Sequence, residues 1–481
     1  MKTIFTVVVY ILSLLAIKAQ THPAIERFMS TAHMRGASVS IMVKEIGSDS
    51  VVYSYDANRE VIPASIIKTI TTATALEILG EDFRYETAIM YDGQVNDSIL
   101  NGNIYIYGSG DPSIGSSNIE ADSDKIIREW VAAIKNTGIK NIVGAVIADE
   151  SIFDTEGISM KWMREDLGSY YGQGCYGLNI YDNRYSLYIN TKSPGSKPEI
   201  ERSKPDMSPM LFHNYLTATN TTRDSSYIVG LPYSNERYLY GTVPANRSGY
   251  RLSGDIPEPA LFLAQHLTKA LQKEDITVTG TPTCYRILSQ SGMWNKQDRK
   301  VIIKTYSLPL KDLARITNHT SSNLYADAIL KTIGSGYEGN AITSSFGKGI
   351  NALKKHWEDK EIETSSLWLF DGSGLAPTDK VTANFMCEFL SYMAKKSTVS
   401  KAFIESIPRA GMEGTVANIL RGSRLQGHVR LKSGSMSRVR SYAGYVTKDD
   451  KQYTVAIIVN NFSCTQTRMR ADIEQLLLSL F

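Results

Sequence analysis

The sequence has few cysteines, and none of them is spaced like a metal ligand. Only four cysteines occur in 481 residues, and no CxxC or Cys/His ligand motif is present. We therefore predict no metal centre. An oxidising compartment would allow disulfides, but spacing alone leaves the pairing open. The cysteines are Cys175, Cys284, Cys387 and Cys464.

The chain also lacks an excess of charge of one sign. It has 52 Lys and Arg against 49 Asp and Glu, a formal net charge of +3. A protein that binds nucleic acid usually carries clustered basic residues, so we expect no nucleic-acid partner. Hydrophobic residues make up 42% of the chain and no long Pro, Gly or Ser tract interrupts it. The whole length should therefore fold, and it is long enough for two or three domains.

Long hydrophobic runs are absent except at the N-terminus. Residues 1–19 contain Lys2, an apolar run and a small residue at Ala19, which is typical of a signal peptide. An uncleaved anchor is the alternative, because Lys18 interrupts the run. Cleavage would remove both lysines and reduce the formal charge from +3 to +1. We expect a periplasmic protein with no transmembrane span after cleavage, and we leave peripheral membrane contact open.

The distribution of strand-like and helix-like segments predicts one domain interrupted by another. Residues 37–55 read as a hairpin, and residues 63–80 read as a helix that is apolar on nearly all sides. Short strand-like segments fill 85–307. Helices return after 308, followed by three strands and a last helix. We therefore predict an α/β domain built from 22–84 and 308–481, with a β-rich insert of two subdomains at 85–307.

Three short motifs are candidates for carrying chemistry, although each is weak by itself. Ser-x-x-Lys occurs twice, at Ser65 and again at Ser345, and Ser-Ser-Asn also occurs twice, at Ser321 and again at Ser116. Only the third is unique. In chain order the motifs are Ser65-Ile-Ile-Lys68, Ser321-Ser-Asn323 and Lys432-Ser433-Gly434.

Local context favours the first Ser-x-x-Lys copy. Ser65 starts the buried helix, and a spacing of three places Lys68 on the same helix face, beneath the hydroxyl. The alternative for Ser65 is an N-capping serine followed by a solvated lysine. A lysine between Ile67 and Ile70 on such an apolar helix is hard to solvate. Ser345 has no comparable helix around it and lies after the second motif.

These residue types suit nucleophilic catalysis without histidine. A serine hydroxyl needs a base, and Lys68 can act as one only when its amine is neutral. Burial lowers the pKa of a lysine, and a second cation such as Lys432 lowers it further. We therefore predict Ser65 as nucleophile, Lys68 as general base, Ser321 as proton relay and Asn323 as a contact to the substrate amide.

The third motif fits recognition of a substrate terminus. Lys432 and the Ser433 hydroxyl would bind a terminal carboxylate, and Gly434 would let the substrate backbone approach. Backbone N–H groups of Ser65 and Ser435 would stabilise the oxyanion. A histidine triad fits poorly, because no Gly-x-Ser-x-Gly motif is present and His319 is the only histidine near a motif serine.

The set SxxK, SxN and K[ST]G resembles the penicillin-recognising D-alanyl-D-alanine peptidases and serine β-lactamases. The 256 residues between Ser65 and Ser321 leave room for a large insert, which resembles the DacB-type carboxypeptidases/endopeptidases of peptidase family S13. Further phrases resemble that family across nearly all of the mature chain. They are residues 102–112 (GNIYIYGSGDP), 371–375 (DGSGL), 411–415 (GMEGT) and 443–445 (AGY).

The resemblance implies a β-lactamase/transpeptidase-like catalytic domain, an antiparallel sheet with flanking helices, interrupted by the two-part insert. It also implies removal of terminal D-alanine from peptidoglycan stem peptides, cleavage of D-alanyl cross-links, no metal or cofactor, and inhibition by β-lactams. In some members an aspartate of the insert binds the diamino-acid side chain of the stem. Asp166 is our candidate, and a salt-bridged surface carboxylate is the alternative for it.

Two departures from the family pattern stand out. Ser433 replaces the more usual threonine but keeps the hydroxyl. The turn after Ser435 is more basic than usual, with Arg438 and Arg440, which either narrows substrate choice or lies on the rim.

Two other functions compete with the peptidase. A β-lactamase or esterase would use the same acylation apparatus but needs a deacylating base, and no phrase supplies one. A wall-binding scaffold without catalysis would not need all three motifs intact. Carboxypeptidase versus endopeptidase preference, the stem's diamino acid and the oligomeric state are left open.

Overall fold

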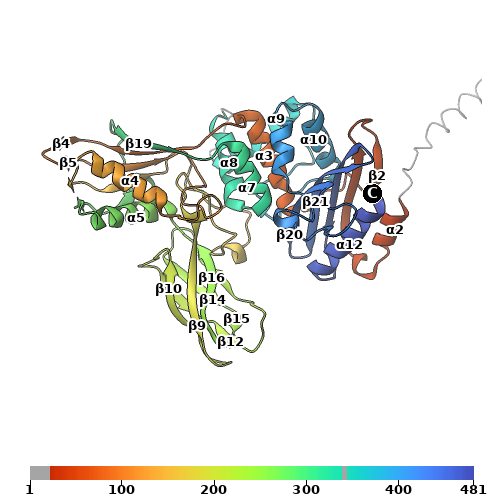
Figure 1. The fold of residues 1–481 in the computed structure, drawn as a ribbon, viewed down its shortest axis with the longest axis horizontal. Coiled ribbons are helices and arrows are strands. Elements are labelled where there is room, and N and C mark those ends of the chain that lie inside the picture. The colour runs from red at the N-terminus through yellow and green to blue at the C-terminus, as the bar shows by residue number, and fades with distance from the viewer. Residues whose placement is uncertain (1–21, 338–343) are drawn as a thin grey trace, which may run out of the picture.

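The computed structural model describes residues 22–337 and 344–481, so the predicted signal peptide lies outside the described residues. The molecule is elongated, with a sheet-and-helix part at one end and two smaller lobes beyond it (Figure 1). Within the described ranges, no helix is long and apolar enough to cross a membrane.

Five antiparallel strands form the central sheet, in the order β2-β1-β22-β21-β20. Both ends of the chain contribute to it, because β1 pairs with β22 along its whole length. Strand β20 lies at an edge of the sheet. The strands are β1 (Ser38–Glu45), β2 (Val51–Tyr55), β20 (Val429–Met436), β21 (Val439–Lys448) and β22 (Lys451–Asn460).

Helices cover both faces of this sheet and create two cores. Successive residues of β22 alternate between them: Val455 and Ile457 belong to one core, Ala456 and Ile458 to the other. Helices α2 (Pro23–Met29) and α12 (Gln466–Leu480) pack on the first face. The other face carries α3 (Ile67–Leu79), α7 (Leu310–Thr320), α8 (Asn323–Ser335), α9 (Ser345–Asp359), α10 (Ala383–Lys395) and α11 (Ser400–Ser406).

The helix expected after Pro63 begins differently from the prediction. A single 3-10 turn, η2 (Ala64–Ile66), precedes α3, and Gly80 ends the helix with a φ of +85°. Residues 67–76 of α3 are all buried, which confirms the predicted burial on most sides of the helix. The turn matters because it separates Ser65 from the regular helix.

The first lobe of the insert is α/β rather than only β-rich. Its core lies between two sheets and the helices α4 (Lys125–Asn136) and α5 (Pro259–Lys273), whose amphipathic pattern the sequence analysis missed. The chain enters through β3 and returns through its antiparallel partner β19. The strands are β3 (Glu86–Tyr91), β4 (Gln94–Asn96), β5 (Ile99–Asn101), β6 (Ile104–Gly108), β7 (Asn141–Ile142), β8 (Val146–Asp149), β17 (Thr277–Val278), β18 (Thr283–Cys284) and β19 (Lys300–Tyr306), and a short helix α6 (Tyr285–Gln290) follows β18.

The second lobe is nested within the first and is all β. Its first and last strands pair at the base, Arg184 opposite Asp255, and it has its own small core. The strands are β9 (Arg184–Thr191), β10 (Glu199–Lys204), β11 (Leu211–Asn214), β12 (Thr217–Thr219), β13 (Tyr227–Val229), β14 (Glu236–Tyr240), β15 (Thr242–Pro244) and β16 (Arg247–Asp255). The predicted α/β fold with a two-part insert is confirmed, while the exact boundaries at 84/85 and 307/308 stay a prediction that the β3–β19 pairing supports.

All four cysteines are free in the structure. Cys387 is buried in α10, as expected for a helical core residue, and Cys175 and Cys284 are also buried. Cys464 alone is partly exposed.

Candidate active site

Ser65 and Lys68 meet at the start of α3. Ser65 lies in the η2 turn, and the Lys68 Nζ donates a hydrogen bond of 2.8 Å to its Oγ. The preceding Ala64 has a φ of +50°, a conformation that costs energy for a residue with a Cβ. Gly374 makes room for this turn, because a Cβ there would lie 2.1 Å from the Ala64 carbonyl oxygen.

Lys68 is completely buried beneath the serine. Its Nζ also donates to Asn323 Oδ1 at 2.6 Å and to the Ser373 carbonyl at 2.5 Å. Burial lowers the pKa of Lys68 to about 8, although the carboxyl groups of Asp327, Asp371 and Asp379 oppose this shift. About one-tenth of the amine is therefore neutral at pH 7 and able to accept the serine proton, far more than for a lysine with its ordinary pKa.

A second buried lysine approaches from β20. The Lys432 Nζ donates to Ser321 Oγ at 2.8 Å and to the Ser433 carbonyl at 2.8 Å. Burial, and then repulsion from Lys68 and Arg440, hold the pKa of Lys432 well below its usual range. We expected Lys432 to lower the pKa of Lys68. The repulsion between the two lysines instead lowers the pKa of Lys432. Ser321 reaches it from the junction of α7 and α8, where its backbone is left-handed, with φ 57° and ψ 37°.

The edge strand β20 lies directly against the Ser65 turn. A Cβ on Gly434 would lie 2.2 Å from Ser441 Oγ and 2.9 Å from the Ser65 backbone nitrogen. The glycine is therefore already required by the close approach of the protein's own backbone, a reason that the sequence analysis did not give. Ser433 Oγ is hydrogen-bonded to Thr415 Oγ1 at 2.8 Å, and Ser435 is exposed.

Asn323 is held at both ends by the protein rather than left free for a substrate amide. Its Oδ1 accepts from Lys68, and its Nδ2 donates to the Tyr171 carbonyl at 2.8 Å. Tyr171 belongs to the insert, so a loop of the first lobe lies against the motif. The second Nδ2 hydrogen of Asn323 can still donate to a substrate carbonyl, so the predicted contact with the substrate amide stays a prediction.

Asp166 is not the salt-bridged surface carboxylate that was its alternative. It is 7% exposed and forms no ion pair among the described residues. Burial raises the pKa of its carboxyl group, against a hydrogen bond from Tyr171 that lowers it. Asp166 thus neighbours the Asn323 site only through Tyr171, and its predicted contact with substrate stays a prediction.

A cavity of about 950 Å³ opens between the two lobes of the insert, and Tyr171 is part of its wall. Its lining combines tyrosines with charged groups, including Tyr170, Arg184 and Arg251. No residue of the three motifs lines this cavity, which neighbours them through Tyr171.

The sequence analysis missed the carboxyl groups behind Lys68. Asp371 accepts hydrogen bonds from the backbone N–H groups of Ser373, Gly374 and Ala376 at 3.0, 2.6 and 2.8 Å, and from Trp162 Nε1 at 2.7 Å. It thereby shapes the loop whose Ser373 carbonyl holds Lys68. The segment 371–375 (DGSGL), which the sequence analysis used only as evidence of the family resemblance, could have pointed to Asp371.

The duplicate motifs have structural roles. Ser345 begins α9, a helix of 15 residues, so the expectation that no comparable helix surrounds it was wrong. Its hydroxyl and its N–H both bond to Asp154. Ser116 accepts from the Tyr325 hydroxyl at 2.8 Å and donates to Asp182 at 2.6 Å. His319 lies in the last turn of α7, and its Nε2 has no hydrogen-bond partner among the residues that the structure describes.

The basic turn after Ser435 divides into two roles. Arg438 donates to the carbonyl groups of Phe462 and Asn461 at 3.0 and 2.7 Å, which ties down the turn. Arg440 lies near Tyr442 and contributes positive charge at Lys432.

Comparison with known proteins places this geometry in one family. The family model described as "D-Ala-D-Ala carboxypeptidase 3 (S13) family" matches residues 22–479. The D-alanyl-D-alanine carboxypeptidase of Actinomadura sp. (strain R39) is 25% identical over 456 residues, which cover 91% of this chain and 80% of the relative. D-alanyl-D-alanine carboxypeptidase DacB of Haemophilus influenzae is 25% identical over 417 residues, which cover 86% and 83%.

Among solved structures, penicillin binding protein 4 (dacB) from Haemophilus influenzae superposes with a TM-score of 0.80 at 24% identity, and the match covers 93% of this chain and 96% of that one. This likeness confirms the fold. With the family match over nearly all described residues, it confirms the resemblance found in the sequence: the chain belongs to the D-Ala-D-Ala carboxypeptidase 3 (S13) family.

Proposed function

We propose that this chain is a serine D-Ala-D-Ala carboxypeptidase and D-alanyl endopeptidase that acts on peptidoglycan stem peptides and cross-links through an acyl-enzyme on Ser65. One observation carries the proposal: a fully buried lysine, Lys68, bonds the Ser65 hydroxyl at 2.8 Å. The names of the curated relatives support the reaction, and a structure of the Haemophilus protein in complex with a β-lactam supports inhibition by that class.

The first half of the reaction forms an ester. The neutral Lys68 amine takes the Ser65 proton while Oγ attacks the carbonyl carbon of the penultimate D-alanine. The resulting oxyanion accepts hydrogen bonds from the backbone N–H groups of Ser65 and Ser435. The C–N bond then breaks as the leaving D-alanine amine receives the proton that Lys68 took, relayed by Ser321, and Lys68 becomes neutral again. Lys68 can then take a proton from the attacking water and return it to Ser65 Oγ. Water hydrolyses the ester and releases the shortened peptide.

The edge of the sheet suits an extended peptide. Residues 408–410 already pair with the first half of β20, through the bridge between Arg409 and Arg430. A substrate can add as a further strand along the second half, next to the Ser65 turn. Lys432 and the paired hydroxyls of Ser433 and Thr415 then face the terminal carboxylate of a carboxypeptidase substrate.

The location follows from the substrate. Peptidoglycan lies outside the cytoplasm, so the enzyme must be exported, and the apolar N-terminal run supports a periplasmic location after cleavage of residues 1–19.

The decisive experiment is mass spectrometry of the purified protein after incubation with benzylpenicillin. Wild type should gain one drug mass on the Ser65 peptide, and Ser65→Ala should gain none. Ser345→Ala is the matched control, because it removes the serine of the second Ser-x-x-Lys copy, and it should label like wild type. Release of D-alanine from a stem pentapeptide should follow the same pattern.

Other outcomes select the competing functions. An adduct on another serine would refute the assignment of the nucleophile. Rapid turnover of the drug with no lasting adduct would favour a β-lactamase. Absence of both adduct and D-alanine release in a folded protein would favour a wall-binding scaffold.

A further inference from the structure

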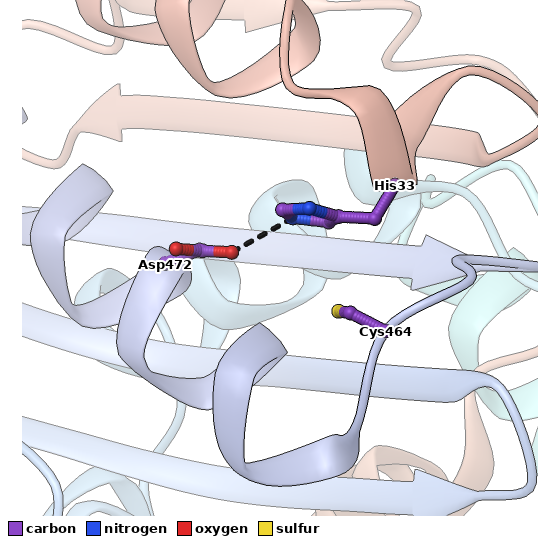
Figure 2. A group of neighbouring side chains, drawn as sticks. All are labelled: His33, Cys464 and Asp472. Carbon is purple, nitrogen blue, oxygen red and sulfur yellow. Dashed lines mark ion pairs between the residues drawn. The ribbon is translucent and has the colours of Figure 1, made fainter.

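Three metal-ligating side chains meet on the face of the sheet opposite the active-site helices. They are His33 from the short η1 turn (Ala32–Met34), Cys464 from the segment after β22, and Asp472 from α12. Their ligand atoms all lie within 4.8 Å of one another. Figure 2 shows the His33 ring directed at the Asp472 carboxylate, with the Cys464 sulfur turned towards both.

The donor set selects a class of metal. An imidazole nitrogen, a thiol and a carboxylate suit zinc and similar transition ions, whereas calcium and magnesium prefer oxygen ligands alone. The His33 Nε2 and Asp472 Oδ2 are 2.8 Å apart as an ion pair. Ligand atoms of a tetrahedral zinc site are roughly 3.5 Å apart, so a shift of under about 1 Å on each side converts the cluster into a site.

The surroundings fit a site that is open to solvent on one side. The side chains of His33 and Asp472 are 17% and 15% exposed, which leaves room for a water as fourth ligand. The backbone holds the cluster together, because the Ser463 N–H donates to the His33 carbonyl at 3.0 Å. Arg468 bonds the Asp472 carboxylate at 3.0 Å, and its largely exposed side chain is free to move away when a cation binds.

We propose that His33, Cys464 and Asp472 form a zinc site that joins the N-terminal turn to the C-terminal helix. The ion would take the place of the hydrogen between His33 Nε2 and Asp472 Oδ2, leaving a neutral imidazole with its hydrogen on Nδ1, and the Cys464 thiol would release its proton to solvent. Its effect would be structural, since α2 and α12 together cover one face of the sheet that carries β20. The sequence analysis, which expected no metal, could not find this site because its ligands are separated by up to 439 positions.

Cobalt titration of the metal-free full chain tests the proposal directly. Co²⁺ bound to a thiolate absorbs in the near ultraviolet, and the signal should saturate at one equivalent and disappear when Zn²⁺ is added. Cys464→Ser and His33→Gln should lose the absorption, and Asp472→Asn should weaken binding by about tenfold or more. Ser463→Ala is the matched control from the same segment and should bind like wild type.

Thermal unfolding and the reactivity of Cys464 provide two further tests of zinc binding. Zn²⁺ should raise the midpoint of thermal unfolding of wild type by about 2 °C and leave Cys464→Ser unchanged. Zn²⁺ should also protect Cys464, the one partly exposed cysteine, from a thiol reagent. Absorption that persists in Cys464→Ser, or no absorption in folded wild type, would overturn the proposal. Penicillin labelling of Ser65 is independent of either outcome.

Discussion

At the scale of the residue, the site depends on two lysines that are kept out of water. Lys68 and Lys432 are both fully buried, and each bonds a motif serine. Burial makes the neutral amine accessible, which is what allows a lysine to replace histidine as a base.

Replacing the base should stop acylation without unfolding the protein. Lys68→Met keeps the volume of the side chain, and we expect the rate of penicillin acylation to fall by about 10²–10⁴-fold. Lys348→Met, which alters the lysine of the second Ser-x-x-Lys copy, should leave the rate unchanged. Stopped-flow measurement with a fluorescent penicillin compares them, and an equal loss in both variants would contradict the role of Lys68.

The pH dependence of wild type follows from the same lysine. The pKa of Lys68 is lowered to about 8, so the neutral, reactive form increases as pH rises towards that value. Acylation should therefore accelerate by about tenfold per pH unit below pH 7 and level off above pH 8. A rate that is flat between pH 5.5 and 8, measured under saturating drug, would show that another group is the base.

Of the carboxyl groups behind Lys68, Asp371 should contribute much more to the free energy of unfolding than Asp379. Asp371→Asn exchanges an acceptor for a donor against Trp162 Nε1 and the Ala376 N–H, so the free energy of unfolding should fall by about 2–4 kcal/mol. Burial and neighbouring carboxyl groups raise the pKa of Asp379 well above its usual range, which favours its neutral form. Asp379→Asn should therefore cost little. Denaturant unfolding of the two variants checks this ranking, which fails if they are equally stable.

At the scale of the element, the site is a contact between the η2 turn and the edge strand β20. The approach is close enough that only glycine fits at position 434. Strand position, rather than any single polar group, thus sets the distance between the nucleophile and the surface on which a peptide would lie.

Moving this strand should impair catalysis more than it impairs stability. Gly434→Ala adds a methyl group 2.9 Å from the Ser65 nitrogen, so β20 must shift, and we expect D-alanine release to fall by about 10²-fold or more. Ser433→Thr, on the same strand, keeps the hydroxyl and should stay within about threefold of wild type. Steady-state assays on a stem pentapeptide measure both, and an active Gly434→Ala enzyme would argue against the strand contact.

At the scale of the whole molecule, the insert is part of the catalytic domain's structure rather than an accessory. Its first lobe supplies Trp162 to Asp371 and Tyr171 to Asn323, and the Glu156 and Cys175 carbonyls accept from the buried Lys331 at 2.6 and 2.9 Å. The second lobe has a separate core and begins and ends on paired strands.

Deleting the second lobe should therefore affect folding much less than deleting the whole insert. Removing 186–253 and joining the paired strands by a short turn should leave a folded protein that labels with penicillin on Ser65. Removing the whole insert, 85–307, should prevent stable folding, because Lys331 and Asp371 lose partners while buried. Circular dichroism and penicillin labelling compare the two deletion variants, and a folded, labelled chain without the insert would refute this division.

The sequence by itself determined the features that depend on residues close together in the chain. A spacing of three brings Lys68 to Ser65 across one turn of the chain, although that turn is 3-10 rather than α-helical, and the short strand-like runs along 429–460 predict strands. Only the tertiary structure decided which distant residues meet: β1 with β22, Tyr171 with Asn323, and His33 with Cys464. Such contacts depend on how whole elements pack, and packing depends on the combined burial of many side chains, which leaves no local pattern in the sequence.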